Sequence, residues 1–247
     1  LPYRQLVGGL LWLAVSTHPD IQYAVQQLSQ YLDCFTYTHW NAAMRMLQYL
    51  KGTRTLGISL GGSNPIQLVG FMDSDWANCL DMRRSVGDSD WANCLDTQCS
   101  IGGYAWSLGS GAVSWAARKQ KTVAASSCEA EYMAAFESAQ ECIWLRALLK
   151  GIDHDITDKP TPILCDNNAA IKLSEDPTLH SRVKHVDIKY HFLRERAQSN
   201  EICIRYINTK YNVADLFTKA LPASQFKRLR DLLGLRQSHD SCEEETT

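Results

Sequence analysis

The chain has 247 residues, and its 25 lysines and arginines against 27 aspartates and glutamates give a formal net charge of −2. Hydrophobic residues make up 45% of the chain and charged residues 21%, a balance that excludes a disordered regulator. With 14 glycines and 7 prolines, a collagen-like fibre is also excluded. The near-neutral charge argues against a general nucleic-acid binder but allows local basic patches.

The sequence also limits the compartment and the partners. No stretch reaches the roughly 18 apolar residues that a membrane span needs, and the first residues do not form a signal peptide, so we expect no membrane partner. The chain starts at Leu1 rather than Met, which suggests a fragment of a longer protein. Nine cysteines, an odd number without a Cys-x-x-Cys pair, favour reduced thiols in an intracellular protein.

Residues 1–60 predict a helical unit of their own. Pro19 and Asp20 suit the first turn of a helix, and apolar residues follow at the helical period: Ile21, Val25, Leu28 and Leu32. Another helix is predicted from near Thr38 to a C-cap at Gly52. We see no strand pattern before residue 66.

From residue 66 the pattern becomes that of an α/β domain. Strands are predicted over 66–73, 161–166 and 201–208, and a hairpin over 103–108 and 112–118. A long helix is predicted over 127–150, and shorter ones over 169–173, 187–199, 212–221 and 223–233. The polar tail from Gln237 is expected to be disordered. This order of elements predicts a mixed sheet flanked by helices.

A tandem repeat interrupts this domain. Residues 73–87 and 88–102 both begin with DSDWANCLD, and the period of 15 residues is too short for a solenoid unit. A duplication inside an existing loop explains the repeat, so either Asp73 or Asp88 is surplus. Because Asp73 follows the strand pattern LVGFM and Asp88 does not follow a strand, Asp73 is preferred and Asp88 is the alternate.

Four carboxylates occur at predicted strand ends and helix starts: Asp73, Glu131, Asp166 and Asp215. Carboxylates at such places can converge on one edge of a sheet, and a cluster of this kind binds hard divalent cations. Two ions about 4 Å apart stabilise both the attacking and the leaving oxygen in phosphodiester cleavage. Taken singly, however, an aspartate at a strand end is more often a turn or N-cap residue.

Successive motifs resemble the ribonuclease H domain of copia-type retrotransposons. They are LVGFMDSDWA, the hairpin with Trp115, SSCEAEYMAA, ILCDNNAAI, RVKHVDIKYHFLRER and NVADLFTKAL. The segments YRQLVGGLLWLAVSTHPDIQYAV and HWNAAMRMLQYLKGT resemble the C-terminal end of the preceding reverse transcriptase. The resemblance covers residues 2–234. It implies a ribonuclease H-like fold with a five-stranded mixed sheet, and Mg²⁺- or Mn²⁺-dependent cleavage of the RNA strand of an RNA–DNA hybrid.

The resemblance also implies the site, the domains and the partners. Asp73, Glu131, Asp166 and Asp215 match the family's acidic quartet, which would hold two ions, and Asn167 follows Asp166 as a nucleic-acid contact. The implied domains are a reverse-transcriptase end (1–62), a ribonuclease H domain (63–222), a C-terminal helix (223–236) and a tail (237–247). The partners are the hybrid and the upstream polymerase domain, in a cytoplasmic virus-like particle or in the nucleus.

Two acidic neighbours are alternates to the quartet. Glu129 lies two residues from Glu131, so the two side chains cannot face one side of a helix, and Ser126 to Glu129 form a capping-box pattern. Asp75 would share a face with Asp73 only if the strand continued, whereas Trp76 suggests that a loop has begun.

A basic stretch suggests the nucleic-acid interface. Residues 180–210 hold seven positive side chains against three acids. Phosphate contacts supply most non-specific affinity, although a solvated helix face explains the pattern equally well. The candidate contacts are Arg118, Lys119, Lys184, Arg194 and Arg196.

Two other functions remain open at this point. The duplication allows a catalytically decayed relic that only binds nucleic acid or a partner. An integrase shares the implied fold but has its glutamate last, whereas Glu131 precedes Asp166 here. The chain holds no Tyr-x-Asp-Asp dyad, so no DNA synthesis is expected from it.

Overall fold

The computed structural model describes residues 1–61, 66–76, 99–124, 126–152, 154–168, 171 and 187–237. Most of the repeat, including Asp88, and most of the predicted helix 169–173 lie outside this part of the chain. Lys184 lies outside it too, as does the tail beyond Gln237.

The helical unit has the predicted form. It consists of α1 (Tyr3–Ser16), the 3-10 turn η1 (Pro19–Ile21), α2 (Gln22–Ser29) and α3 (Tyr37–Gly52). Thr36 caps α3, because its amide donates to Nδ1 of His39 over 2.9 Å in a capping box. The apolar faces meet in a small core, in which the hydroxyl of the buried Tyr3 donates to the carbonyl of Leu28 over 2.8 Å.

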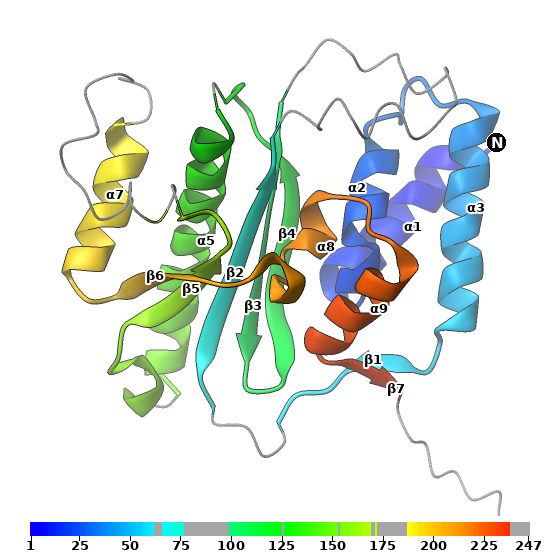
Figure 1. The fold of residues 1–247 in the computed structure, drawn as a ribbon. Helices are drawn as coiled ribbons and strands as arrows, with labels where there is room; N and C mark the ends of the chain where they lie inside the picture. Colours follow the sequence, from blue (N-terminus) through cyan, green and yellow to red (C-terminus); the bar gives the residue numbers. More distant parts are fainter. Residues whose placement is uncertain are drawn as a thin grey trace, which may run out of the picture.

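A five-stranded sheet forms the centre of the molecule, in the order β4-β3-β2-β5-β6 (Figure 1). Its strands are β2 (Leu68–Asp75), β3 (Ile101–Leu108), β4 (Gly111–Lys119), β5 (Thr161–Cys165) and β6 (Ile202–Tyr206). The first three strands pair antiparallel, whereas β5 runs parallel to both β2 and β6. This mixed topology confirms the ribonuclease H-like fold that the motifs implied.

One face of the sheet is covered by α5 (Ser127–Lys150), with α7 (Asp187–Gln198) beside it (Figure 1). This face encloses the larger core, centred on the fully buried Trp106 of β3. The indole lies over Gly70 of β2, where a Cβ atom would come within 2.4 Å of the ring. The close approach therefore requires glycine at that position. The 3-10 turn η3 (His154–Thr157) follows α5 and leads into β5.

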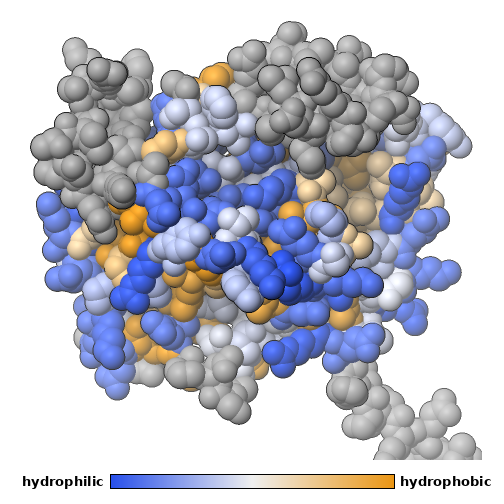
Figure 2. All heavy atoms as spheres, viewed as in Figure 1, coloured by the Kyte–Doolittle hydropathy of each residue, from blue (hydrophilic) through white to orange (hydrophobic). Residues whose placement is uncertain are grey.

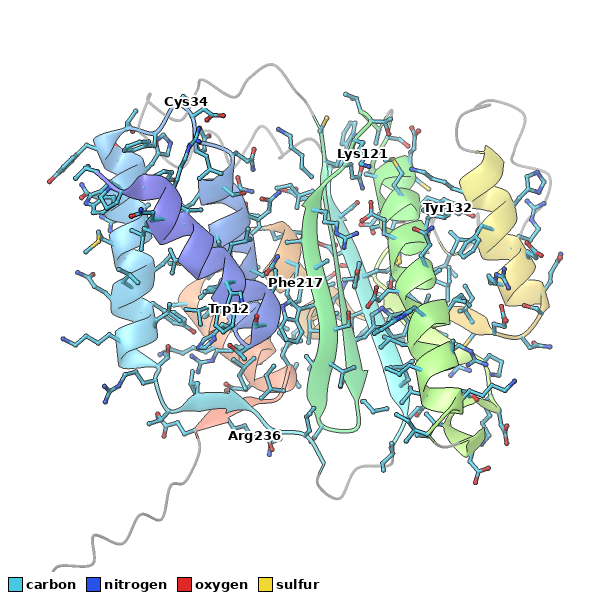
Figure 3. The ribbon with its side chains drawn as sticks, turned by 180° about the vertical axis from the view of Figure 1, so that it is seen from behind. Trp12, Cys34, Lys121, Tyr132, Phe217 and Arg236 are labelled. Carbon is cyan, nitrogen blue, oxygen red and sulfur yellow. The ribbon has the colours of Figure 1, made fainter. Side chains whose placement is uncertain are left out.

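The other face is covered by α8 (Asp215–Thr218) and α9 (Ala223–Leu232), and then by the helical unit. The fully buried Phe217 lies in this core, between the sheet and the helical unit (Figure 3). The indole of Trp115 in β4 donates to the carbonyl of Ala14 in α1 over 2.8 Å, which ties the sheet to the helical unit.

A second, two-stranded sheet ties the chain's two halves together. β1 (Leu56–Ile58) pairs antiparallel with β7 (Leu235–Gln237), and the amide of Ser59 donates to the carbonyl of Gly234 over 2.8 Å. Gly234 has a φ of +86°, the left-handed conformation that a C-capping glycine adopts readily. Tyr49 of α3 accepts from Arg230 of α9 over 3.3 Å beside these strands.

Four expectations about the elements were wrong. Strand β1 precedes residue 66, and Gln237 belongs to β7 rather than to a tail, because three-residue strands leave no readable period. Strand β2 continues to Asp75, since the ladder with β3 extends to the pair Asp75 and Ile101. The predicted helix 212–221 is the four-residue α8, preceded by the 3-10 turn η5 (Thr209–Tyr211).

Among the coloured residues of Figure 2, hydrophilic ones predominate, with hydrophobic ones visible between them. None of the helices within the described ranges is long and apolar enough to cross a bilayer. The cysteines in those ranges are free thiols, and Cys142 and Cys165 are buried.

Candidate metal centre

The parallel pairing of β2 and β5 brings two aspartates to one edge of the sheet. Phe71 is in register with Leu164, so Asp73 and Asp166, two residues further along each strand, lie next to each other. Asp73 is buried within β2 and Asp166 is half-buried just after β5. The sheet register therefore positions both carboxylates through the backbone.

The α5 helix adds the third carboxylate. One oxygen each of Asp73, Glu131 and Asp166 lie within 4.8 Å of one another. The side chain of Ser126 caps α5 by accepting from the amide of Glu129 over 3.2 Å, which fixes where the helix begins. Glu131 consequently lies in the second turn, over the end of β2. The structure thus brings together three of the four predicted quartet residues.

The surroundings of Glu131 disfavour its negatively charged form. Burial raises its pKa well above the usual range, and the neighbouring carboxylates Asp73 and Asp166 raise it further, although the amide of Ser74 donates to it. Its Oε2 is buried and has no hydrogen-bond partner among the described residues. An orphaned carboxylate oxygen beside two more carboxylates fits the donor set that Mg²⁺ or Mn²⁺ prefers.

Asp215 reaches the same region from α8. Its side chain is fully buried, and burial raises its pKa to about 7, with a further contribution from Asp73. Asn212 fixes this segment, because its side chain donates to the carbonyl of Met72 over 3.0 Å and accepts from the amide of Ala214 over 3.2 Å. The Asn-x-x-Asp motif therefore positions Asp215 against β2.

Lys219 links the two carboxylates of this side. Its Nζ lies 2.9 Å from Oδ1 of Asp215 and 3.4 Å from Oδ2 of Asp73. Burial alone would lower the pKa of Lys219, but the two carboxylates raise it above its usual value. Lys219 lies one helical turn after Asp215, a spacing that brings two side chains together.

Sequence reasoning missed three polar side chains at this centre. Lys219 is one of them. Thr218 donates a hydrogen bond to Oδ2 of Asp73, and Thr209 donates to Oδ2 of Asp166 over 2.7 Å. The i+3 and i+4 spacing of Thr218 and Lys219 from Asp215 could have indicated their shared face, whereas Thr209 became visible only in the tertiary structure.

The alternates lie in other surroundings. Asp75 follows Asp73 on the same side of β2, because the strand continues, and it contributes to raising the pKa of Tyr23 in α2 to about 12, where burial is the larger cause. Asp75 is therefore directed toward the helical unit and is not one of the three grouped carboxylates. Glu129 lies in the first turn of α5, and its amide donates to the Ser126 side chain that caps this helix, as the sequence predicted.

The basic candidates do not share one face. Arg118 and Lys119 alternate along β4, so they lie on opposite sides of the sheet, and Lys119 donates to Gln30 of the helical unit over 3.4 Å. Arg196 of α7 pairs with Glu201 over 3.0 Å. Arg194 is half-buried on the same helix, and Asn167 donates its amide to the sulfur of Cys165 over 3.3 Å.

Comparison with known proteins gives the family. The chain is 36% identical over 238 residues to the retrovirus-related Pol polyprotein from transposon TNT 1-94 of Nicotiana tabacum, and 38% identical over 240 residues to that from transposon RE2 of Arabidopsis thaliana. These alignments cover 96% and 97% of this chain. The chain belongs to the copia-type Pol polyprotein family. The chain spans 17% and 15% of the length of those two relatives.

The chain is also similar to a further relative and to solved structures. It is 41% identical over 145 residues to secreted RxLR effector protein 161 of Plasmopara viticola, covering 59% of the chain and 92% of that protein. No family model matches it. Among solved structures, the N-terminal RNase H domain of Rv2228c from Mycobacterium tuberculosis aligns with a TM-score of 0.41 and 9% identity, covering 68% of this chain and 98% of that one.

Proposed function

We propose that this chain is a divalent-metal-dependent endonuclease that cleaves the RNA strand of RNA–DNA hybrids during retrotransposon reverse transcription. The grouping of Asp73, Glu131 and Asp166 within 4.8 Å at the edge of a ribonuclease H-like sheet is the observation that carries the proposal. A structural protein has no need for three converging carboxylates of which two are buried, because each buried charge costs stability unless it is paired.

The residues have distinct tasks in this proposal. Asp73, Glu131 and Asp166 would hold one ion, and Asp73 with Asp215 would hold the second. Bound there, two Mg²⁺ or Mn²⁺ ions would lower the pKa of the attacking water and stabilise the departing 3′ oxygen. Thr209 holds Asp166 and Thr218 holds Asp73, so both carboxylates keep their orientation before an ion arrives.

Substrate recognition would use the surfaces beside this centre. The 2′-hydroxyl groups in the minor groove of the hybrid distinguish RNA from DNA. Asn167 directly follows Asp166. Arg118 lies near Glu137 of α5, and Arg194 belongs to α7, which contacts α5. We further propose that the chain acts together with the upstream polymerase domain of its polyprotein, in a cytoplasmic virus-like particle or in the nucleus, and without a membrane.

Asp166→Asn tests the proposal. The substitution keeps the shape and the acceptor for Thr209 but removes the charge, so we expect a folded protein without Mg²⁺-dependent cleavage of a labelled hybrid. The variant Asp158→Asn is the control and should cleave normally, because Asp158 is exposed and precedes β5, whereas Asp166 follows the other end of that strand. Near-normal cleavage by folded Asp166→Asn protein would refute the site.

A relic that binds without cleaving is the second candidate, because the repeat begins at a proposed metal ligand. In the described part of the chain, the first copy enters the sheet as Asp73 to Asp75 and the second leaves it as Ile101 and Gly102. If the enzyme is active with Asp73 as the ligand, Asp73→Asn should abolish cleavage and Asp88→Asn should not. Absence of cleavage in the unaltered chain with Mg²⁺ and with Mn²⁺ would favour the relic.

A further inference from the structure

We propose that Lys219 is a built-in counter-ion that occupies, in the metal-free protein, the place of the second divalent cation and competes with it. The inference rests on the proposed function, since it concerns how the same carboxylates are filled. It predicts that the two ions bind in sequence and with unequal affinity.

The first support is the position of the ammonium group. Nζ of Lys219 lies within ion-pair distance of one oxygen of Asp73 and one oxygen of Asp215, at 3.4 Å and 2.9 Å. The Asp73 side chain is 3% exposed and the Asp215 side chain is not exposed at all. Two buried carboxylates so close together need a positive charge between them, and in this structure the lysine supplies it.

The second support is the asymmetry of the four carboxylates. Among the described residues, the ion pairs of this centre are both made by Lys219, and both involve the Asp73–Asp215 side. On the other side, Glu131 Oε2 has no hydrogen-bond partner in the described part of the chain, and Asp166 is held by the neutral Thr209. One half of the centre is therefore neutralised in advance while the other half is left open for a cation.

The third support is that the lysine can leave. Its side chain is 31% exposed, whereas the two carboxylates are buried, so the lysine side chain borders solvent and the carboxylates do not. A divalent cation that used the same two oxygens would have to displace Nζ, because like charges at that separation repel strongly in a buried site. The first ion shares only Asp73 with the lysine, since Glu131 and Asp166 make no ion pair with Lys219 in the described part of the chain.

Binding of Mn²⁺ to the full chain without nucleic acid tests the inference, followed by electron paramagnetic resonance. For the unaltered chain we expect one tighter and one weaker ion. Lys219→Gln should raise the affinity for the weaker ion by on the order of tenfold, because that ion no longer has to displace a positive charge. Lys219→Arg keeps the charge and should restore the unequal affinities.

Lys210→Gln is the matched control. It removes the same charge from a lysine whose Nζ lies 5.6 Å from the ring of Tyr211, so it should leave both affinities unchanged. If the weaker ion binds to the unaltered chain and to Lys219→Gln with the same affinity, the inference is overturned. Lys219 would then only form a structural ion pair. Absence of Mn²⁺ binding in every variant would instead overturn the proposed metal-dependent function.

A second measurement protects the test against misfolding of the glutamine variant. In the unaltered chain, the side-chain NMR signal of Lys219 should stay in place during the first equivalent of Mg²⁺ and shift during the second. A shift completed with the first equivalent, or no shift at all with two ions bound, would contradict displacement of the lysine.

Discussion

The two faces of the central sheet are built in different ways. The α5 face is covered by the 24-residue α5, with α7 beside it, and encloses a core with Trp106, Tyr132 and Ile163. The opposite face is covered by the four-residue α8, by α9 and by a helical unit from the start of the chain. The first face is complete within the domain, whereas the second is completed by residues more than 100 positions away in sequence, as the bond from Trp115 to Ala14 shows.

The proposed metal centre lies where elements of both faces meet. Glu131 comes from the α5 face, whereas Asp215, Thr218 and Lys219 come from the α8 face. A long helix thus supplies a carboxylate that makes no ion pair in the described part of the chain, and a short segment held by Asn212 supplies a carboxylate that pairs with Lys219. The centre depends on the packing of both faces, and perturbing each face separately should distinguish their contributions.

The largest expected effect is the loss of cleavage when the proposed metal ligands are substituted. Glu131→Gln and Asp215→Asn remove one charge from each face, and each should lower the rate of hybrid cleavage by more than about 100-fold, since altering even the surroundings of metal ligands costs about 10–100-fold. Single-turnover assays with Mg²⁺ would measure both. A small effect of Asp215→Asn beside a large effect of Glu131→Gln would place the chemistry on the α5 face alone.

The next effect is on stability, through one tryptophan from each face. Trp106→Ala should lower the free energy of unfolding by about 3–5 kcal/mol, because it opens a cavity beneath α5. Trp115→Ala should cost less, since Trp115 is half-buried, but it removes the hydrogen bond to Ala14 and should expose the α1 region to protease. Urea unfolding and limited proteolysis would check this ranking, which the reverse order would contradict.

Two glycines sharpen the comparison further. A Cβ at Gly70 would meet the Trp106 ring at 2.4 Å, and one at Gly103 would meet Cβ of Phe217 at 2.6 Å. Both alanine variants should lose about 1–3 kcal/mol by overpacking. Only Gly103→Ala displaces α8, opposite Asp73, so it should also lower cleavage measured well below its melting temperature. Equal activity of the two stable variants would show that α8 tolerates movement.

The smallest expected effect is the pH dependence of the metal-free chain. The pKa of Asp215 is raised by burial to about 7, and the pKa of Glu131 is also raised. Between the ordinary carboxylate range and pH 7 the folded state therefore binds more protons than the unfolded state, so stability falls as pH rises. The slope approaches about 1.4 kcal/mol per pH unit for one proton. Asp215→Asn should flatten the slope of denaturant-derived stability against pH, and a slope that rises instead would contradict these shifts.

Periodicity and capping signals determined much of this protein in advance. The long helix was predicted over 127–150 and spans Ser127–Lys150, because the Ser126 cap and Gly151 mark its ends locally. The motifs predicted the fold, and they predicted that Asp73, Glu131 and Asp166 lie together at one edge of the sheet, as they do. These features depend on residues close in sequence or on strand ends that any such sheet brings together.

Only the tertiary structure decided the rest. The pairing of β1 with β7 depends on two three-residue segments separated by about three-quarters of the chain, and so short a strand carries no period of its own. The extension of β2 to Asp75 depends on its partner strand β3. The bridge from Lys219 to Asp73 joins side chains 146 positions apart, and no local pattern encodes a contact that the packing of α8 on the sheet creates.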